Sequence, residues 1–241
     1  MAVNNIPDRR IITRRFFLGI AIFFPLIVLA GFAKTYYLRG FLGGPAVPSM
    51  LVHLHGVVMT AWILLFVTQV WLISSRRIKL HQRLGMASIA LAVLLVIVGI
   101  LTAINAAKNG SNSAPPDIPP LSFLVVPVFD MLLFATFFGA AIYYRRQPAN
   151  HKRLMLLTVL NFLPPAIGRL PFAVVAAAGP LAFFGVPDLL AIIFIAIDTW
   201  RHGKLNKVFA LGALLMIISH PLRLIISGTD IWLRFAAWLT S

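Results

Sequence analysis

Apolar residues in this chain form seven long blocks separated by short polar gaps. A helix needs about twenty apolar residues to cross the hydrocarbon core of a bilayer, and a helix satisfies its own backbone groups where water is absent. The pattern predicts an all-α bundle of seven transmembrane helices, at residues 16–37, 50–73, 83–105, 121–144, 154–177, 184–200 and 207–228. Because the gaps are short, we expect residues 1–241 to form a single transmembrane domain.

Basic residues occupy alternate gaps between these blocks. Fifteen of the 21 Lys and Arg lie in four such gaps: Arg9, Arg10, Arg14 and Arg15; Arg76, Arg77, Lys79 and Arg83; Arg145, Arg146, Lys152 and Arg153; and Arg201, Lys204 and Lys207. Lys and Arg near span ends stay on the cytoplasmic side. The alternation therefore predicts a cytoplasmic N-terminus and a C-terminus on the outer, periplasmic side.

Composition narrows the function classes. Hydrophobic residues make up 60% of the chain and charged residues 11%, which is far from the balance of a soluble domain. The net charge of +15 is spread over short loops, where it suits anionic lipid headgroups, so we expect no nucleic-acid partner. Cysteine is absent, which excludes disulfides, iron–sulfur clusters and cysteine nucleophiles.

The fifth and sixth predicted spans contain the prolines. Pro164, Pro165 and Pro171 interrupt the fifth, and Pro180 and Pro187 surround the start of the sixth. Proline removes a backbone donor, and such breaks are tolerated at membrane depth where they line a cavity. A small-solute or ion permease that uses a cavity along the broken fifth helix is therefore one candidate function.

Polar side chains at membrane depth are costly and usually functional. Counted by helical rise, seven of them fall in the outer half of the predicted bundle: His53, His55, Asp130, Asn161, Arg169, His220 and Arg223. We expect a polar site there, centred on His220, one of His53 or His55, and Arg169 or Arg223. His53 and His55 are two residues apart and so point about 200° apart on a helix. Ion pairing of Asp130 with Arg169 or Arg223 is the purely structural alternative.

The same outer residues fit several kinds of ligand. His53, His55 and His220, with Asp130, are suitable ligands for copper or zinc. Histidine with aspartate and arginine also suits a proton-linked quinone site. Two histidines on facing helices with nearby cations suit haem, which would place His220 opposite His53 or His55.

The cytoplasmic side shows a second pattern. Arg76 to Leu84 and Arg145 to Leu154 are similar basic segments that end in His-x-Arg-Leu, with His81 and His151 at matching places. This indicates a parallel repeat of the helix hairpins 50–105 and 121–177. His81 and His151, with Arg83 and Arg153 beside them, could hold a second haem.

Several short motifs carry a family resemblance. The chain has His53-Leu54-His55-Gly56, Ala61-Trp62, Gln69, His81-Gln82-Arg83-Leu84-Gly85 and His151-Lys152-Arg153-Leu154-Met155. This pattern resembles uncharacterised bacterial multi-pass membrane proteins, which implies the bacterial inner membrane but no chemistry. The histidine arrangement is similar to that of b-type membrane cytochromes. We therefore favour a redox role with haem b or a quinone, and a membrane redox partner.

Overall fold

The computed structural model describes residues 9–47, 49–109 and 118–241, and within these ranges the chain is helical with no β-strand. The long helices are α1 (Arg9–Phe32), α2 (Met50–Ser74), α3 (Ile78–Asn109), α5 (Val125–Tyr143), α9 (Pro180–His202) and α10 (Lys207–Ile226). Shorter helices are η1 (Ala33–Tyr37, a π-helix), α4 (Pro120–Phe123), η2 (Tyr144–Arg146, a 3-10 helix), α6 (Pro148–Leu160), α7 (Pro164–Ile167), α8 (Ala173–Ala178) and α11 (Asp230–Thr240).

Six helical segments are long and apolar enough to cross a membrane. They are Phe17–Tyr37, Met50–Ser74, Ile78–Asn109, Pro120–Arg146, Pro180–His202 and Lys207–Ile226. Each overlaps a predicted span, so the all-helical class is confirmed and six of the predicted spans correspond to candidate membrane helices. The sixth predicted span is longer than expected, because Pro180 occupies the first helical turn and Pro187 is accommodated inside α9.

The predicted fifth span at 154–177 is broken, as its prolines indicate, and none of its pieces is a candidate membrane span by itself. Its first part is α6, which has 13 residues and reaches only about 20 Å. Beyond it the backbone tightens, with the amide of Leu163 bonded to the carbonyl of Leu160, and Pro164 and Pro165 open the single turn of α7. Two consecutive residues without an amide donor cannot continue the α6 hydrogen-bond ladder.

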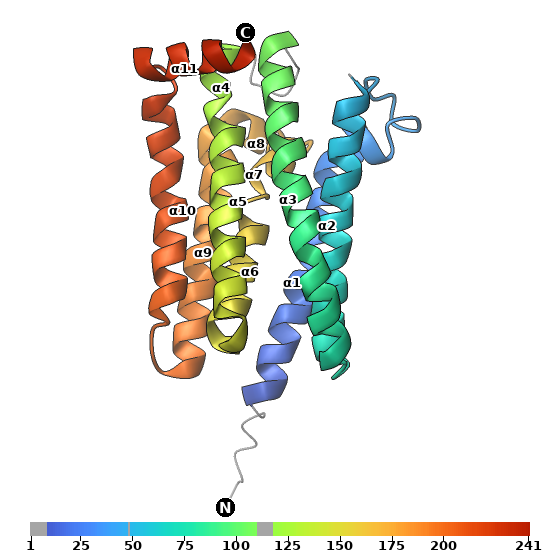
Figure 1. The fold of residues 1–241 in the computed structure, drawn as a ribbon, viewed down its shortest axis with the longest axis vertical. Helices are drawn as coiled ribbons and strands as arrows, with labels where there is room; N and C mark the ends of the chain where they lie inside the picture. Colours follow the sequence, from blue (N-terminus) through green and yellow to red (C-terminus); the bar gives the residue numbers. More distant parts are fainter. Residues whose placement is uncertain (1–8, 48, 110–117) are drawn as a thin grey trace, which may run out of the picture.

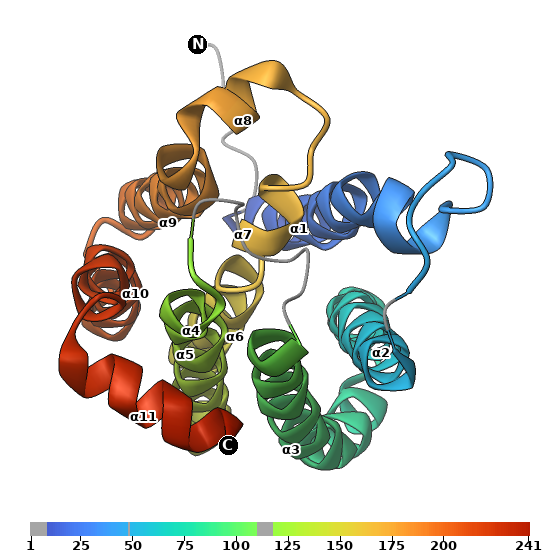
Figure 2. The ribbon, with the colours of Figure 1, turned by 90° about the horizontal axis from the view of Figure 1, so that it is seen from above.

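The helices form an upright bundle with two distinct ends (Figure 1). The start of α1 and the turns α2–α3, α5–α6 and α9–α10 lie at one end, and α11 lies across the other. The described basic gaps fall in those turns, so we call the first end the basic end and the second the opposite end. Seen from above, α2 and α10 lie on opposite sides of the bundle, with α5, α6 and α7 between them (Figure 2).

The core surrounds α6, which is apolar on every side except at its start. Leu156, Leu157 and Leu160 are each at most 2% exposed, and they join side chains of α1, α5 and α10 in one cluster. A helix that is apolar all round is stable only when its neighbours cover it. α7 is fixed by close approach: a Cβ on Gly31 of α1 would collide with the backbone oxygen of Ala166.

Candidate functional site

Two histidines from separate helices face each other near the basic end. His81 lies in the first turn of α3 and His151 in the first turn of α6. Their ring centres are 6.4 Å apart and their planes are inclined by 81°. Both rings are half-buried, and no hydrogen bond joins them. The predicted cytoplasmic-side pair is thus brought together in space.

The Nδ1 atom of each ring is held by a neighbouring group. Nδ1 of His151 lies 2.8 Å from the carbonyl oxygen of Ala141 on α5. Nδ1 of His81 contacts the side-chain amide of Gln69 on α2, whose oxygen, in the orientation that satisfies its neighbours, accepts from the amide of Gly85 at 3.0 Å. Metal-binding imidazoles are commonly oriented in this way by a partner on the second nitrogen. Nε2 of each ring has no hydrogen bond within the described ranges.

An apolar groove lies farther along the bundle, and neither histidine lines it. It has a volume of about 390 Å³ and runs between α3 and α5, lined by Ile89, Phe134, Phe138, Gly139, Ile142 and five other residues. Ile142 follows Ala141, the residue that holds His151, and Ile89 lies about two turns beyond His81 on α3. A flat apolar ligand edge fits such a groove better than a polar solute does.

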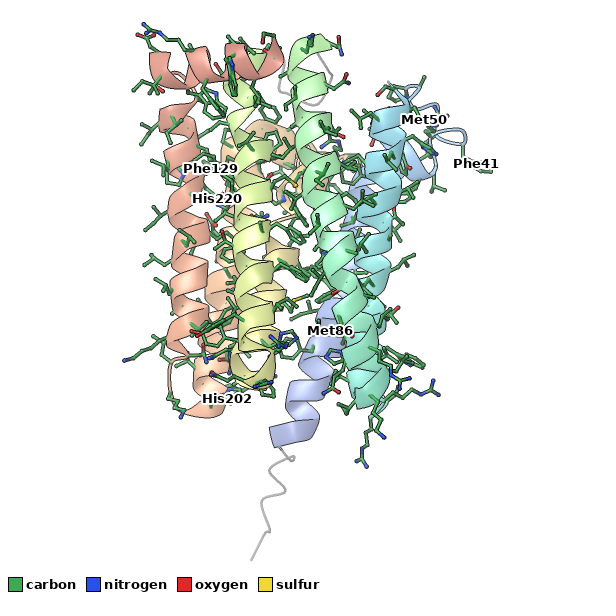
Figure 3. The ribbon with its side chains drawn as sticks, viewed as in Figure 1. Phe41, Met50, Met86, Phe129, His202 and His220 are labelled. Carbon is green, nitrogen blue, oxygen red and sulfur yellow. The ribbon has the colours of Figure 1, made fainter. Side chains whose placement is uncertain are left out.

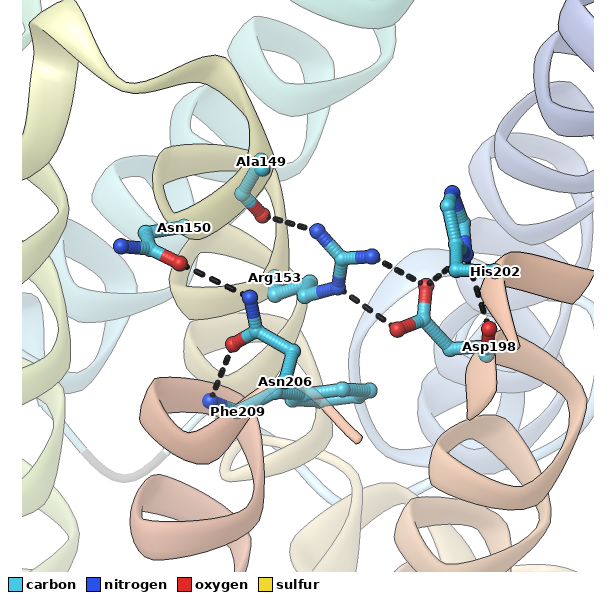
Figure 4. Close-up of polar contacts among 7 residues, drawn as sticks. All are labelled: Ala149, Asn150, Arg153, Asp198, His202, Asn206 and Phe209. Carbon is cyan, nitrogen blue, oxygen red and sulfur yellow. Dashed lines mark hydrogen bonds and ion pairs between the residues drawn. The ribbon is translucent and has the colours of Figure 1, made fainter. Parts of the chain in front are cut away.

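Arg153 and Arg83, the two arginines expected beside the histidines, have different surroundings. Arg153 is 4% exposed, and its Nε and Nη2 atoms donate to Asp198 of α9 at 2.8 and 2.7 Å (Figure 4). It also donates to the carbonyl of Ala149, so the expectation that Arg153 serves a haem is wrong, because its guanidinium is already committed. Arg83 is exposed at the surface of α3.

Figure 4 shows the hydrogen bonds and ion pairs that connect the helices at the basic end. Nδ1 of His202 lies 2.8 Å from the carbonyl oxygen of Asp198, and Asn206, which caps α10, donates to the side chain of Asn150 at 2.9 Å. The network thus ties together α6, α9 and α10. The role of Asp198 was missed, although an acidic residue in an apolar span is a signal that the sequence does contain.

Lys152 is the remaining cation next to the pair. Its ammonium lies 5.3 Å from the centre of the Phe17 ring, a cation–π contact. Burial lowers the pKa of Lys152, the neighbouring Arg153 lowers it further, and Asp198 acts in the opposite direction.

A second polar group lies toward the opposite end, between α5, α9 and α10. Nη1 of Arg223 donates to the carboxylate of Asp130 at 2.6 Å, and both side chains are almost fully buried. Ser219 accepts from Arg223 at 3.3 Å, and Asn161 donates to the backbone oxygen of Asp130 at 2.9 Å. Asp130, Asn161 and Arg223 of the predicted outer site are therefore brought together. Asp130 pairs with Arg223, which is the structural alternative given in the sequence analysis.

His220 extends this group toward α9 (Figure 3). Its Nδ1 lies 2.8 Å from the Oδ1 of Asp188, and its ring stacks on Phe184 at 4.5 Å. Neither ring nitrogen makes a well-aligned hydrogen bond, so the ring is positioned by its contact with Asp188 and by its stacking on Phe184. Asp188, like Asp198, is an acidic residue in an apolar span that the sequence analysis did not single out.

The other predicted outer residues lie across the bundle. His53 is exposed and its Nδ1 lies 3.2 Å from the hydroxyl of Tyr36, His55 lies on the same helix, and Arg169 donates to the carbonyl of Pro165. Because α2 and α10 are on opposite sides, His53 and His55 do not meet His220 (Figure 2). The predicted copper or zinc site of these three histidines is therefore not assembled, and no group of three metal-ligating side chains occurs among the residues described.

Comparison with known proteins gives no further guide, since no protein-family model, curated protein or solved structure matches the chain.

Proposed function

We propose that this chain is a bacterial inner-membrane protein that crosses the bilayer seven times, with its basic end in the cytoplasm. Six helical segments are long enough to cross alone, and the broken segment α6–α7–α8 would make the seventh crossing. The gathering of the basic turns at one end supports this orientation (Figure 1). The exposed Leu, Ile and Phe side chains along the helices suit a lipid surround.

Its role, we propose, is electron transfer through one haem b bound at the basic end, with His81 and His151 as axial ligands. The observation that carries this proposal is the separation of the two rings. An imidazole nitrogen binds a metal at about 2.0–2.1 Å and lies about 1.1 Å from its ring centre, so two histidines that held one metal between them would have ring centres about 6.3 Å apart. The ring centres of His81 and His151 are 6.4 Å apart.

The surrounding residues fit such a group. Nε2 of His151 is left with the lone pair that metal binding needs, Nε2 of His81 makes no hydrogen bond within the described ranges, and the apolar groove between α3 and α5 would offer a dry surface for a macrocycle edge. Arg153 is committed to Asp198, so Lys152 and Arg83 are the cations available for propionates. These residues suit one haem at the basic end. A haem held by His220 with His53 or His55 is not proposed.

The chain's own residues orient the ligands. The carbonyl of Ala141 accepts the Nδ1 proton of His151, which fixes that ring and leaves Nε2 unprotonated. The side-chain amide of Gln69 lies on Nδ1 of His81 and donates to it in the orientation that also satisfies Gly85, so binding of a metal by Nε2 of His81 would require the Gln69 amide to turn over. When bound, haem b carries one electron at a time between its ferrous and ferric states, and membrane quinones or a second redox protein are suitable partners.

An absorption spectrum tests this proposal. We expect protein expressed with ample haem and purified in detergent to show the Soret and α bands of a six-coordinate haem b. Both bands should be lost or weakened in His81→Ala and His151→Ala. His202→Ala is the matched control, because His202 lies at the same end but bonds to Asp198. A colourless wild-type protein, or full bands in His81→Ala, would remove the proposal.

A permease is the second candidate, and the broken helix favours it. α6 ends in mid-bundle at Asn161, whose side-chain oxygen is buried without a partner, close to the Asp130–Arg223 pair. Half-helices that meet at buried polar groups are typical of transporter binding sites. Flux measured in proteoliposomes tests this candidate: transport abolished by Asn161→Leu would support it, and no flux of any ion or small solute offered would count against it.

A further inference from the structure

The short helix α11 lies across the opposite end of the bundle (Figure 1) and follows its outer edge when seen from above (Figure 2). Its 11 residues reach about 16 Å, so the helix is too short to cross a hydrocarbon core of about 30 Å. Nε1 of Trp232 donates to the carbonyl of Leu121 on α4 at 2.9 Å, and Nζ of Lys108 on α3 donates to the carbonyl of Ser241 at 3.3 Å. Hydrogen bonds therefore fix α11 to the bundle near its start and at its end.

α11 packs on the bundle through one face and exposes a second apolar face. Trp232 and Ala236 are buried, in an apolar cluster with side chains of α3 and α5. Ile231, Phe235 and Trp238 are 84%, 43% and 69% exposed. At about 100° per residue, these three lie within about 60° of one another and about 110° around the helix from the buried pair. They form a separate apolar stripe, which is not the margin of the packed face.

The charged side chains of α11 occupy a third face. Asp230 and Arg234 are exposed and lie about 160° around the helix from the buried pair, with the exposed apolar stripe between the two faces. A helix that packs on a bundle in water needs an apolar face only toward that bundle. The exposed stripe therefore indicates an apolar neighbour other than the bundle itself.

The adjoining surface favours lipid as that neighbour. α11 follows α10, a candidate membrane span, after the short connection 227–229. Ile225 in the last turn of α10 is 70% exposed, so an exposed apolar surface reaches the end of α10 and resumes at Ile231 in the first turn of α11. Tryptophan favours the depth of the lipid headgroups. A second copy of the chain suits the stripe less well, because three side chains expose much less than the about 800 Å² that each partner of a stable dimer buries.

We propose that α11 is an interfacial helix that lies flat in the outer leaflet of the membrane. Its stripe of Ile231, Phe235 and Trp238 contacts acyl chains, and Arg234 lies among the headgroups. Helices of this kind bury their apolar face about 5–10 Å into the boundary between headgroups and acyl chains. The proposal rests on the membrane placement proposed above and is independent of the haem pair, which lies at the basic end.

Because the chain has no cysteine, nitroxide labels can be attached at single introduced cysteines. Full-length Phe235→Cys, Trp238→Cys and Arg234→Cys are labelled and reconstituted in vesicles of phosphatidylethanolamine and phosphatidylglycerol. Electron paramagnetic resonance then measures how often each label collides with oxygen, which concentrates among acyl chains, and with a water-soluble nickel chelate. The labels at Phe235 and Trp238 should collide more with oxygen, at a depth of about 5–10 Å, and the label at Arg234 should collide more with the nickel chelate.

A label in a membrane span separates failure of this proposal from failure of the membrane placement. Leu214→Cys is that reference, because Leu214 is exposed near the middle of α10, and its label should meet oxygen at greater depth. If it does, while the labels at Phe235 and Trp238 meet the nickel chelate as often as the label at Arg234, α11 lies in water and the proposal is overturned alone. A nickel-accessible label at Leu214 would overturn both. An immobile label at Trp238 that neither reagent reaches would show that protein covers the stripe, and it would also overturn the proposal; Ile231→Cys, on the same stripe, repeats the measurement.

Discussion

The buried pair of Asp130 and Arg223 allows a quantitative test of how the bundle is held together. The two charged atoms are 2.6 Å apart, and the side chains are 6% and 0% exposed. At an effective dielectric constant of about 20, unit charges at that distance attract by about 6 kcal/mol. Removing two ions from water costs several kcal/mol for each ion, so the net contribution of the intact pair is expected to be small.

Breaking the pair is a different matter, because one charge is then left buried without its partner. We expect Arg223→Leu and Asp130→Leu each to lower the free energy of unfolding by about 3–5 kcal/mol. The double variant Asp130→Leu/Arg223→Leu should recover most of that loss, since it buries no charge. The resulting coupling energy would be about 3 kcal/mol or more.

Reversible unfolding in mixed detergent micelles, followed by circular dichroism, measures these differences. Arg234→Leu on α11 is the control, because Arg234 is exposed, and its stability should change by about 0.5 kcal/mol or less. Single variants within about 1 kcal/mol of wild type, or a double variant that loses the sum of both single losses, would refute the reasoning that this pair is a closed, coupled unit.

Three further predictions follow from other contacts. Gln69→Glu places a carboxylate on Nδ1 of His81; a hydrogen bond stronger by about 1 kcal/mol in the ferric form lowers the haem midpoint potential by about 40 mV in a redox titration, and an unchanged or raised potential would contradict the assignment of Gln69. Gly31→Leu should lower stability by several kcal/mol, because its side chain meets the backbone of Ala166, whereas Gly19→Leu, which meets open space, should be nearly neutral; equal losses would contradict the close approach of α1 and α7. The pKa of Lys152 lies below its ordinary value of 10.5, so the folded chain binds fewer protons than the unfolded chain between those two values and stability rises with pH in that window. Lys152→Met should flatten this rise in pH-dependent unfolding curves, and an unchanged slope would contradict the stated burial.

The sequence predicts the helical class well, because long apolar blocks are an unambiguous signal in a chain with so few charges. It does not predict where the fifth span breaks: Pro164 and Pro165 signal an interruption, but only the packing of Gly31 against Ala166 shows how the freed segment is held. The prolines of α9 carry the same signal and yet stay within a helix. The presence of proline therefore does not by itself show whether a helix is broken at that point or continues through it.

For the sites, helical rise gives depth but not direction around the bundle. His55 and His220 are both predicted in the outer half of the bundle, yet they lie on opposite sides because α2 and α10 do (Figure 2). His81 and His151 were paired through the internal similarity of two basic segments, and this signal does carry positional information. Asp188 and Asp198 belong to a set of only six acidic residues, which is itself a signal in so apolar a chain, but the sequence does not show which histidine or arginine each of them meets.

The most direct test of the haem proposal is the electron paramagnetic resonance spectrum of the oxidised, purified protein. Two axial imidazoles with planes inclined by 81° should give a strongly anisotropic low-spin ferric signal. That signal should become high-spin or disappear in His151→Ala and persist in His202→Ala. A high-spin signal from wild-type protein, or no haem signal at all, would contradict bis-histidine ligation by His81 and His151.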